Sequence, residues 1–482
     1  MKLGALIGVD AAGEQAEATV TGCAIDHRKV APGTVFGAFR GLARNGEDYI
    51  AGAVEAGAVA VVARPEASVP AGVVHIADAE PRRAFARIAA KFFAPFPGTT
   101  VAVTGTNGKT STVEMVRQLW RMQGHHAASI GTLGVTTTDS EGRAQAVSTG
   151  LTTPDIVTFL SNMAGLRREG VTNAAFEASS HGLAQFRTEG LPVKVVGFTN
   201  LSRDHLDYHG TMEAYLEAKL RLFSEVVDRD GSAVIWADDP VSARVMDIAR
   251  ERGLKLFTVG TKGETLRLVE RTPTQLGQTL MIEAESKVHK VNLPLIGAYQ
   301  AANALVAAGF ALATGGALSD VLGGLSRLQP VRGRLERAVI TAKGAPVYVD
   351  YAHTPDGLQA AIEALKPHAK ERLIVVFGAG GDRDTGKRPE MGAIAARMAD
   401  VAIVTDDNPR TEDPATIRSA IMAAAPGARE VGDRRTAIAA AVAEAGEGDV
   451  VLVAGKGHET GQIVGDMVLP FDDVSVAREV AA

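Results

Sequence analysis

A glycine-rich loop near residue 105 is the first segment whose residue types suggest chemistry. It follows the apolar run that ends at Val103 and comprises Gly105, Thr106, Asn107, Gly108, Lys109 and Thr110. The backbone N–H groups of such a loop, placed before a helix, can surround phosphate groups. The Lys109 ammonium can neutralise the charge of the β- and γ-phosphates, and the Thr110 hydroxyl can reach Mg²⁺. The usual phosphate-loop pattern has glycine where this chain has Val103, and a plain glycine-rich turn is the alternative.

Three side chains farther along the chain could hold a metal ion. Glu177 follows the apolar run Asn173–Phe176, and a carboxylate at the end of a strand is well placed to hold Mg²⁺, with a solvated glutamate as the alternative. His205 also follows a predicted strand, although an isolated histidine more often has a structural role. Lys219 lies at the edge of the apolar stripe of a helix predicted over 212–223. It should therefore face the interior or a cleft, with snorkelling of its alkyl stem as the alternative.

A further set of polar residues lies in the C-terminal third, where each group follows a predicted strand. Arginine can bind a carboxylate through two parallel hydrogen bonds, and glutamate can bind an ammonium. An amino acid with charge at both ends would match such a set, whereas surface arginines are the alternative. The residues concerned are Arg388, Asp407, Asn408, Pro409, Arg410, Gly455 and Glu459.

The elements expected to position these residues alternate between strands and helices. Apolar runs predict strands at residues 58–63, 73–76, 100–103, 173–176, 193–198, 233–236, 347–349, 373–377, 401–404 and 450–453. Helices are predicted at residues 84–93, 109–122, 212–223 and 304–313. This alternation is typical of mostly parallel sheets covered by helices. In such sheets ligands bind beyond the carboxyl ends of the strands, where the polar residues above are found.

The length of the chain and its proline- and glycine-rich segments predict three α/β domains. A single core rarely exceeds about 250–300 residues, and this chain has 482. Breaks are predicted at residues 94–98 and 330–333. We therefore expect a small N-terminal α/β domain over residues 1–97. A central P-loop ATPase-like domain with a parallel sheet should follow over 98–331, and a Rossmann-like domain over 332–482.

Composition limits the class of protein. The net charge of -6 lacks the basic excess that nucleic-acid binding usually requires. Cys23 is the only cysteine, so no intrachain disulfide can form, as is typical of a reducing compartment. The sequence has no signal-peptide pattern and no apolar run of about 18–20 residues that could span a bilayer. We expect a cytoplasmic monomer without nucleic-acid or membrane partners.

The ordered combination of motifs resembles the Mur ligase family over essentially the whole chain. The motifs concerned are Gly105–Thr110, the segment Glu177-Ala178-Ser179-Ser180-His181, Asn200 with Asp204-His205, and Glu217-Ala218-Lys219. The resemblance implies ATP and Mg²⁺ as cofactors and Lys109, Glu177, His205 and Lys219 as the catalytic group. It also implies that Lys219 is carbamylated and holds a second Mg²⁺ together with Glu177 and His205.

Other segments are similar to the nucleotide contacts of this family. Asn303 resembles the adenine contact, Arg334 is offered to the phosphates, and the segment with Asp350 and His353 matches the signature of the nucleotide cleft. Gln300 stands where the family commonly has asparagine. The resemblance implies that the nucleotide binds between the second and third domains, so that domain closure completes the site.

Residues 407–410 are similar to one subgroup of the family. That subgroup adds meso-diaminopimelate to the D-glutamate carboxylate of UDP-N-acetylmuramoyl-L-alanyl-D-glutamate through an acyl phosphate, in peptidoglycan precursor synthesis. The resemblance to this subgroup implies that the polar residues of the C-terminal third bind the amino acid. The implied contacts to the UDP-linked sugar-peptide are Asp26, His27, Arg28, Leu151, Thr152, Thr153, Pro154, Ser179, Gln185 and Arg187. His27 stands where the subgroup usually has serine.

Several alternative functions remain open from the sequence. The same ligation could use L-lysine as the amine. A folyl-polyglutamate synthetase has a related architecture but lacks a separate UDP-binding domain. A P-loop kinase or GTPase would leave the third domain without a role. A non-catalytic binding protein would not need Lys109, Glu177 and Lys219 together.

Overall fold

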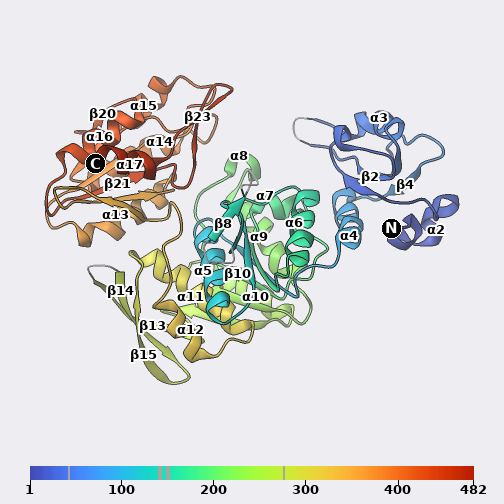
Figure 1. Ribbon diagram of the computed structural model, residues 1–482, viewed down its shortest axis with the longest axis horizontal. Coiled ribbons are helices and arrows are strands. Elements are labelled where there is room, and N and C mark those ends of the chain that lie inside the picture. The colour runs from blue at the N-terminus through green and yellow to red at the C-terminus, as the bar shows by residue number, and fades with distance from the viewer. Residues whose placement is uncertain (42–43, 139–143, 148–151, 275–276) are drawn as a thin grey trace.

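The computed structural model describes residues 1–482 except 42–43, 139–143, 148–151 and 275–276. Three α/β bodies follow one another along the chain, each built on its own sheet, and the central body lies between the other two (Figure 1). The two chain termini lie at opposite ends of the molecule. Among the described residues, no helix has both the length and the apolar composition that a bilayer crossing requires.

The N-terminal body is a parallel sheet in the order β1-β2-β3-β4. Its strands are β1 (Gly22–Ala24), β2 (Thr34–Gly37), β3 (Ala58–Ala63) and β4 (Val74–Ala77). Its helices and turns are α1 (Leu3–Ile7), α2 (Val9–Ala12), η1 (Gly13–Gln15), η2 (His27–Lys29), η3 (Gly46–Tyr49), α3 (Ile50–Glu55) and α4 (Pro81–Phe93). The strand predicted at 58–63 is confirmed by β3. Its uninterrupted apolar run suits a strand that is covered on both faces.

The central body contains a sheet in the order β15-β14-β13-β12-β11-β10-β5-β9-β6-β7-β8. The strands from β13 to β6 in this order run parallel. The parallel strands are β5 (Thr99–Thr104), β6 (Ala127–Gly131), β9 (Asn173–Glu177), β10 (Val195–Phe198), β11 (Ser232–Trp236), β12 (Lys255–Gly260) and β13 (Leu266–Thr274). The parallel sheet predicted for this region is confirmed.

Two antiparallel extensions of this sheet were not predicted. They are formed by β7 (Gly134–Thr138) with β8 (Ala144–Val147), and by β14 (Gly277–Ala284) with β15 (Lys287–Leu293). β13 to β15 project from the central body on the side of the C-terminal one (Figure 1). β13 and β15 expose most of their side chains, and the sequences of the two hairpins lack the continuous apolar runs used to predict strands.

Helices pack on both faces of the central sheet. They are α5 (Lys109–Met122), α6 (Ile156–Arg168), α7 (Ser180–Ala184), α8 (Leu206–His209), α9 (Met212–Arg221), α10 (Ser242–Glu251), α11 (Ala298–Ala313) and α12 (Leu318–Leu325). α9 continues into a π-helical turn, η4 (Leu222–Val226). The helix predicted at 109–122 is confirmed, and the one predicted at 304–313 begins six residues earlier, at Ala298.

The C-terminal body has a sheet in the order β16-β17-β21-β18-β19-β20, parallel except for β16. Its strands are β16 (Glu336–Ile340), β17 (Pro346–Asp350), β18 (Leu373–Phe377), β19 (Val401–Val404), β20 (Arg429–Glu430) and β21 (Val450–Ala454), with a separate hairpin of β22 (Gly461–Val464) and β23 (Met467–Pro470). Its helices are α13 (Pro355–Leu365), η5 (Lys366–His368), α14 (Lys387–Met398), α15 (Pro414–Met422), α16 (Arg434–Glu444) and α17 (Asp473–Ala481). The predicted parallel α/β organisation is confirmed.

A buried ion pair fastens the last helix to the C-terminal body. Arg434 opens α16 and Asp473 opens α17, and both side chains are 0% exposed. The Arg434 guanidinium donates to the two Asp473 carboxylate oxygens at 2.8 and 2.7 Å. It also donates to the carbonyl of Ala454 at 3.0 Å. Loss of either partner would leave an uncompensated charge in the interior.

Asp473→Ala should therefore lower the free energy of unfolding by about 3–5 kcal/mol. Urea denaturation followed by circular dichroism would measure the loss. Glu479→Ala is the matched control, because it breaks the exposed Arg435–Glu479 pair between the same two helices and should cost no more than about 1 kcal/mol. Equal losses for the two variants would contradict this view of the buried pair.

Candidate active site

The glycine-rich loop connects β5 to α5, as predicted, and two of its glycines have backbone angles that favour glycine. φ is +148° at Gly105 and +87° at Gly108. A Cβ at Gly105 would overlap with Thr199 Oγ1, and one at Gly108 would overlap with Asn303 Oδ1. These two positions therefore need glycine both for backbone conformation and for space.

The segment after β10 holds the loop in place. The backbone N–H groups of Thr106 and Asn107 donate to the backbone and side-chain oxygens of Asn200, each at 2.9 Å. Thr199 Oγ1 donates to the Asn107 carbonyl at 2.7 Å. Because β5 and β10 are parallel neighbours, their carboxyl ends bring these segments together.

Lys109 lies across the loop that precedes it. Its Nζ donates to the carbonyl oxygens of Gly105 at 3.0 Å and Thr106 at 2.8 Å. Burial lowers the pKa of the Lys109 ammonium, and the negative charge of Glu177 opposes that shift. The amine is thus placed at the centre of a loop suited to phosphate.

Glu177 ends β9 inside the site and is 1% exposed. Its Oε1 accepts a hydrogen bond from the Thr132 N–H at 2.7 Å. Burial raises the pKa of the Glu177 carboxyl, while Lys109 and a hydrogen bond from Thr110 lower it. A Cβ at Gly131 would overlap with this carboxylate. The arrangement gives a buried acid beside a buried amine, with a hydroxyl at its edge.

Lys219 projects from α9 into the same region, which confirms the prediction that it faces the interior. It is 1% exposed, and its Nζ donates to the Gly105 carbonyl at 2.8 Å. The Nζ atom also lies 4.2 Å from the centre of the Tyr215 ring. Burial, followed by the charge of Lys109, lowers the pKa of Lys219 well below its usual value. A neutral amine is the form of lysine that can react with CO₂, as the predicted carbamylation would require.

His205 lies at the mouth of the site in a left-handed conformation, with φ of +54°. Its Nε2 is 3.4 Å from Asp204 Oδ2, and burial lowers the pKa of the imidazole to about 4. Among the described residues, no group of three His, Cys, Asp or Glu side chains could hold a metal ion. A set made of Glu177, His205 and Lys219 would therefore depend on modification of the lysine.

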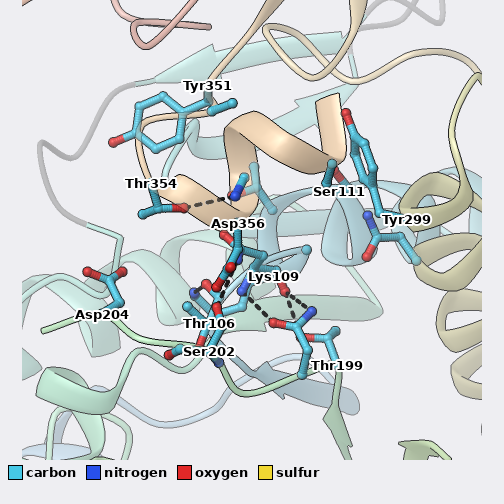
Figure 2. A pocket seen from close by; sticks show the side chains of 18 of the residues that line it. Thr106, Lys109, Ser111, Thr199, Ser202, Asp204, Tyr299, Tyr351, Thr354 and Asp356 are labelled. Atoms are coloured by element: carbon cyan, nitrogen blue, oxygen red, sulfur yellow. Dashed lines mark hydrogen bonds between the residues drawn. The ribbon is translucent and has the colours of Figure 1, made fainter. Parts of the chain in front are cut away.

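A cavity of about 430 Å³ opens above the loop, between the central and C-terminal bodies. Tyr351 and Thr354 from the C-terminal body face Thr106 and Lys109 across it (Figure 2). The cavity is also lined by further residues that the sequence predicted to belong to the site: Asn107, Gly108, Thr110, Glu177, His205, Asn303, Arg334, Asp350 and His353. The fold thus brings together the residues predicted to bind ATP.

Arg334 connects the two bodies at this cavity. It donates to Thr110 Oγ1 at 3.2 Å, and its guanidinium lies 4.4 Å from the centre of the Tyr351 ring. Gln300, which departs from the family pattern, donates to the Arg334 carbonyl at 3.1 Å and accepts from Asn303 at 3.3 Å. The glutamine therefore links the predicted adenine contact to the predicted phosphate contact.

Asp350 fixes the segment that joins the two bodies. Its carboxylate accepts from the N–H groups of Leu335 at 2.7 Å and Ala352 at 2.8 Å, and from Tyr299 Oη at 3.2 Å. Burial raises the pKa of Asp350. His353 has its Nδ1 2.8 Å from the Tyr351 carbonyl. Both predicted residues thus line the cavity while holding the backbone that shapes it.

A second cavity of about 440 Å³ adjoins the first and shares Thr152, Asp204, His205 and His353 with it. It leads from the central site to the C-terminal loops. Its lining combines residues predicted to contact the sugar-peptide with residues predicted to contact the amino acid: Thr152, Thr153, Ser179, Arg187, Asp407, Asn408, Arg410, Gly455 and Glu459.

The sugar-peptide residues of the central body form one network. Thr153 Oγ1 donates to the Glu177 carbonyl at 2.8 Å and accepts from the Ser179 N–H at 3.0 Å. Arg187 donates to the Thr153 carbonyl at 2.9 Å and to Gln185 Oε1 at 2.7 Å. The network joins the second cavity directly to the strand that ends in Glu177. Leu151 lies outside the described residues.

The loop Asp407–Arg410 is anchored by buried polar contacts. Asn408 Oδ1 accepts from Lys456 Nζ and from the Ile463 N–H, each at 2.9 Å, and Asn408 Nδ2 donates to Glu459 Oε2 at 2.8 Å. Arg410 Nη1 donates to the Gly381 carbonyl at 2.7 Å. Among the described residues, the buried Asp407 Oδ2 atom has no hydrogen-bond partner. At this end the cavity therefore presents the carboxylates of Asp407 and Glu459 and the guanidinium of Arg410.

Arg388 is not among the lining residues of either cavity, but its Nη2 donates to the carbonyl of Gly380, which lines the second one, at 3.4 Å. Its side chain is 4% exposed and donates to both oxygens of Glu412, at 2.8 and 2.9 Å. Arg383, in the preceding loop, lines the second cavity with Lys387 and was not singled out from the sequence. Its position in the sequence could have identified Arg383, because it lies within the glycine-rich loop that follows β18, whereas Arg388 lies in α14.

The predicted UDP-binding residues lie in the N-terminal body, beyond the carboxyl end of β1. Asp26 accepts from the Arg28 backbone N–H at 3.0 Å and from its guanidinium at 2.7 Å. The His27 ring stacks on Tyr49, with centres 4.2 Å apart. None of these three predicted residues lines either cavity, so a ligand touching both regions must extend across the molecule.

Comparisons with known proteins agree on one family. The models for the Mur ligase family catalytic domain, the Mur ligase middle domain and the Mur ligase glutamate ligase domain match residues 19–93, 103–311 and 333–457. A relative from Zymomonas mobilis, named UDP-N-acetylmuramoyl-L-alanyl-D-glutamate–2,6-diaminopimelate ligase, is 58% identical over 464 residues, covering 95% of this chain and 94% of the relative. A relative of the same name from Caulobacter vibrioides is 52% identical over 458 residues, covering 95% and 94%.

Solved structures show the same architecture. A structure of a UDP-N-acetylmuramoyl-L-alanyl-D-glutamate–2,6-diaminopimelate ligase aligns with a TM-score of 0.73 at 31% identity, covering 100% of this chain and 98% of the other. A MurF ligase from Thermotoga maritima, in complex with ADP, has a TM-score of 0.61 at 19% identity, covering 96% and 97%. The latter likeness concerns the fold.

Gly108→Ala should weaken ADP binding by about tenfold or more. A side chain at this position would favour a different loop backbone in the free protein. Restoring the left-handed backbone on ADP binding would cost roughly 1–2 kcal/mol, and each 1.4 kcal/mol corresponds to a factor of ten in affinity. Isothermal titration calorimetry would measure the change. Gly165→Ala in α6, where the added Cβ meets open space, is the control and should bind ADP as the wild type does. Unchanged affinity in Gly108→Ala would argue against the proposed packing of Asn303 on the loop.

Proposed function

This chain belongs to the Mur ligase family, and we propose that it uses ATP to join the D-glutamate carboxylate of UDP-N-acetylmuramoyl-L-alanyl-D-glutamate to meso-diaminopimelate. The main support is the pair of adjoining cavities, one lined by the phosphate loop and the other by the C-terminal loops. A reaction that joins an acid to an amine at the expense of ATP needs all three reactants to meet at one point. His205 and Asp204 line both cavities and mark that point.

The reaction proceeds through an acyl phosphate. The glutamyl carboxylate attacks the γ-phosphorus of ATP, and ADP leaves. The amine then attacks the acyl carbon, and phosphate leaves. Lys109 and Arg334 offset the negative charge that concentrates on the phosphates during transfer. No protein nucleophile is required, since the residues act by positioning the reactants and by neutralising charge.

The residues around Glu177 fit a magnesium ion. The carboxylate of Glu177 and the hydroxyl of Thr110 are oxygen donors, which Mg²⁺ prefers, and His205 and carbamylated Lys219 complete the proposed set. Burial disfavours the charged form of Glu177, and a divalent cation would offset that cost. When bound, Mg²⁺ neutralises charge on the ATP phosphates.

The amino acid binds through its charged ends in the second cavity. Arg410 is proposed to bind the distal carboxylate, and Asp407 and Glu459 the ammonium groups. Arg383 lines the same cavity, so we add it to the proposed carboxylate contacts. Arg388, whose guanidinium is paired with Glu412 and donates to the Gly380 carbonyl, remains a proposed contact to a carboxylate of the amino acid.

The proposed activity predicts ADP release that depends on both co-substrates, with a strong preference between amines. meso-Diaminopimelate has a distal carboxylate that L-lysine lacks, and lysine would leave Arg410 unpaired in the cleft. The wild-type kcat/KM for diaminopimelate should therefore exceed that for lysine by roughly 10³-fold or more. A coupled ADP assay at matched amine concentrations measures both values. Equal values would overturn the choice of amine, and ADP release without an amine would overturn the ligase reaction.

Arg410→Ala should lose most diaminopimelate-dependent activity without gaining efficient use of lysine, because the rest of the pocket keeps its shape. The matched control is Arg429→Ala, which removes an exposed arginine paired with Glu444 and should leave activity unchanged. Full activity of Arg410→Ala would remove this residue from the proposed pocket.

Lys219→Ala should be largely inactive, and short carboxylic acids should partly restore its activity by replacing the carbamate. The same ADP assay with and without added acetate tests this. ¹³C NMR after exposure to ¹³C-bicarbonate provides a second measurement, because the wild type should show a carbamate signal that Lys219→Ala lacks. Full activity without acetate would reduce Lys219 to a packing role.

A further inference from the structure

The first turn of α4 lies on the edge of the N-terminal sheet where the predicted UDP-binding segment is found. α4 follows β4, and residues 26–28 follow β1. Since β1 to β4 are parallel, both segments lie beyond carboxyl ends of strands, where α/β sheets bind ligands. Arg82 is the second residue of this helix and has no role in the proposed reaction so far.

The same helix packs against the segment of the central body that contains Arg187. The Arg83 guanidinium lies 5.7 Å from the centre of the Phe186 ring. A Cβ at Gly190 would lie 2.6 Å from the Cβ of Ala90 in α4. Arg82 precedes Arg83 in the chain, and Arg187 follows Phe186. Both arginines therefore lie at the same junction between the two bodies.

Neither arginine at this junction pairs with a carboxylate within the part of the chain that the structure describes. Arg82 Nη2 donates to the Arg40 carbonyl at 3.0 Å, and its guanidinium lies 4.9 Å from the Phe39 ring centre. Arg187 donates to the Thr153 carbonyl and to the Gln185 amide oxygen. Burial lowers the pKa of Arg82, and the charge of Arg187 adds to that effect. Burial also lowers the pKa of Arg187, and the charge of Asp155 opposes that shift without forming an ion pair. Among the described residues, two half-buried cations are thus without a direct ion pair, and Arg82 also lacks a nearby carboxylate.

Arg83 provides the contrast within the same turn. It lies 3.6 Å from Glu80, 3.8 Å from Glu189 and 3.0 Å from Glu225, measured between guanidinium nitrogens and carboxylate oxygens. Its charge is therefore offset by the protein itself. The junction supplies carboxylates to one arginine and leaves its neighbour without one, which is the pattern expected of a site for an external anion.

We propose that Arg82 and Arg187, from two different domains, bind the diphosphate of the UDP-linked substrate. Identification of this anion rests on the proposed function. The diphosphate lies between uridine and sugar, so a substrate held by residues 26–28 at one end and entering the second cavity at the other must pass between the two bodies. Guanidinium groups bind phosphate oxygens through paired hydrogen bonds. Arg82 thereby couples substrate binding to the position of the N-terminal domain.

Arg82→Gln should raise the KM for the UDP-linked dipeptide about tenfold or more, with kcat and the KM values for ATP and diaminopimelate nearly unchanged. Arg83→Gln is the matched control. It should lower the thermal unfolding temperature and leave the KM for the UDP-linked dipeptide as it is. Arg82→Lys keeps the charge and should recover part of the lost affinity, which a purely structural role of the arginine would not explain.

Calorimetry with UDP and with uridine tests the subsite without the reaction. The wild type should bind UDP more tightly than uridine, and Arg82→Gln should remove most of that difference. Unchanged KM and unchanged UDP affinity in a folded Arg82→Gln variant would overturn the proposal. If the wild type failed to ligate the dipeptide yet bound UDP in an Arg82-dependent way, the proposed function would fall and the diphosphate subsite would stand.

Discussion

The carbonyl oxygen of Gly105 accepts hydrogen bonds from two buried lysine side chains, Lys109 at 3.0 Å and Lys219 at 2.8 Å. Burial lowers the pKa of both amines, and the charge of Lys109 lowers the pKa of Lys219 further, whereas Glu177 opposes the shift at Lys109. Glu177 offers one negative charge nearby and pays for its own burial with a raised pKa. The centre of the molecule is therefore suited to receive anions, and both the phosphates of a nucleotide and a carbamate on Lys219 would supply the missing charge.

The backbone geometry of the loop makes this arrangement possible. Gly105 and Gly108 leave room for the close approach of Thr199 and Asn303, and the segment after β10 fixes the peptide groups of the loop. The loop is held by strands of the central sheet, whereas its open side is completed by Arg334 and Tyr351 from the region that leads into the C-terminal body. Relative motion of the two bodies would thus change the charge around the nucleotide directly.

The two outer bodies meet the central one through different kinds of contact. The N-terminal body packs through α4, whose apolar side joins the central core and whose first turn carries both a neutralised arginine and an unneutralised one. The C-terminal body meets the centre across the cavities, with Arg203 lying 3.9 Å from Asp384 and 3.8 Å from Glu390. These exposed ion pairs are individually weak, so they add little to the stability of this interface.

The sequence alone determined the phosphate loop, most of the parallel strands and the inward position of Lys219, because these depend on local patterns: an apolar run, a glycine spacing and a helical stripe. The antiparallel strands β7, β8, β14 and β15 were not predicted because their sequences lack the continuous apolar runs by which strands were identified. They pair as hairpins at the two edges of the central sheet. Only the tertiary structure could show that Arg383 lines the second cavity and that Glu412, from another loop, pairs with Arg388, because both facts depend on how separate loops meet. The same holds for Arg82, because a charge without a counter-charge is a property of the surrounding fold and cannot be read from the residue's own neighbours in the chain.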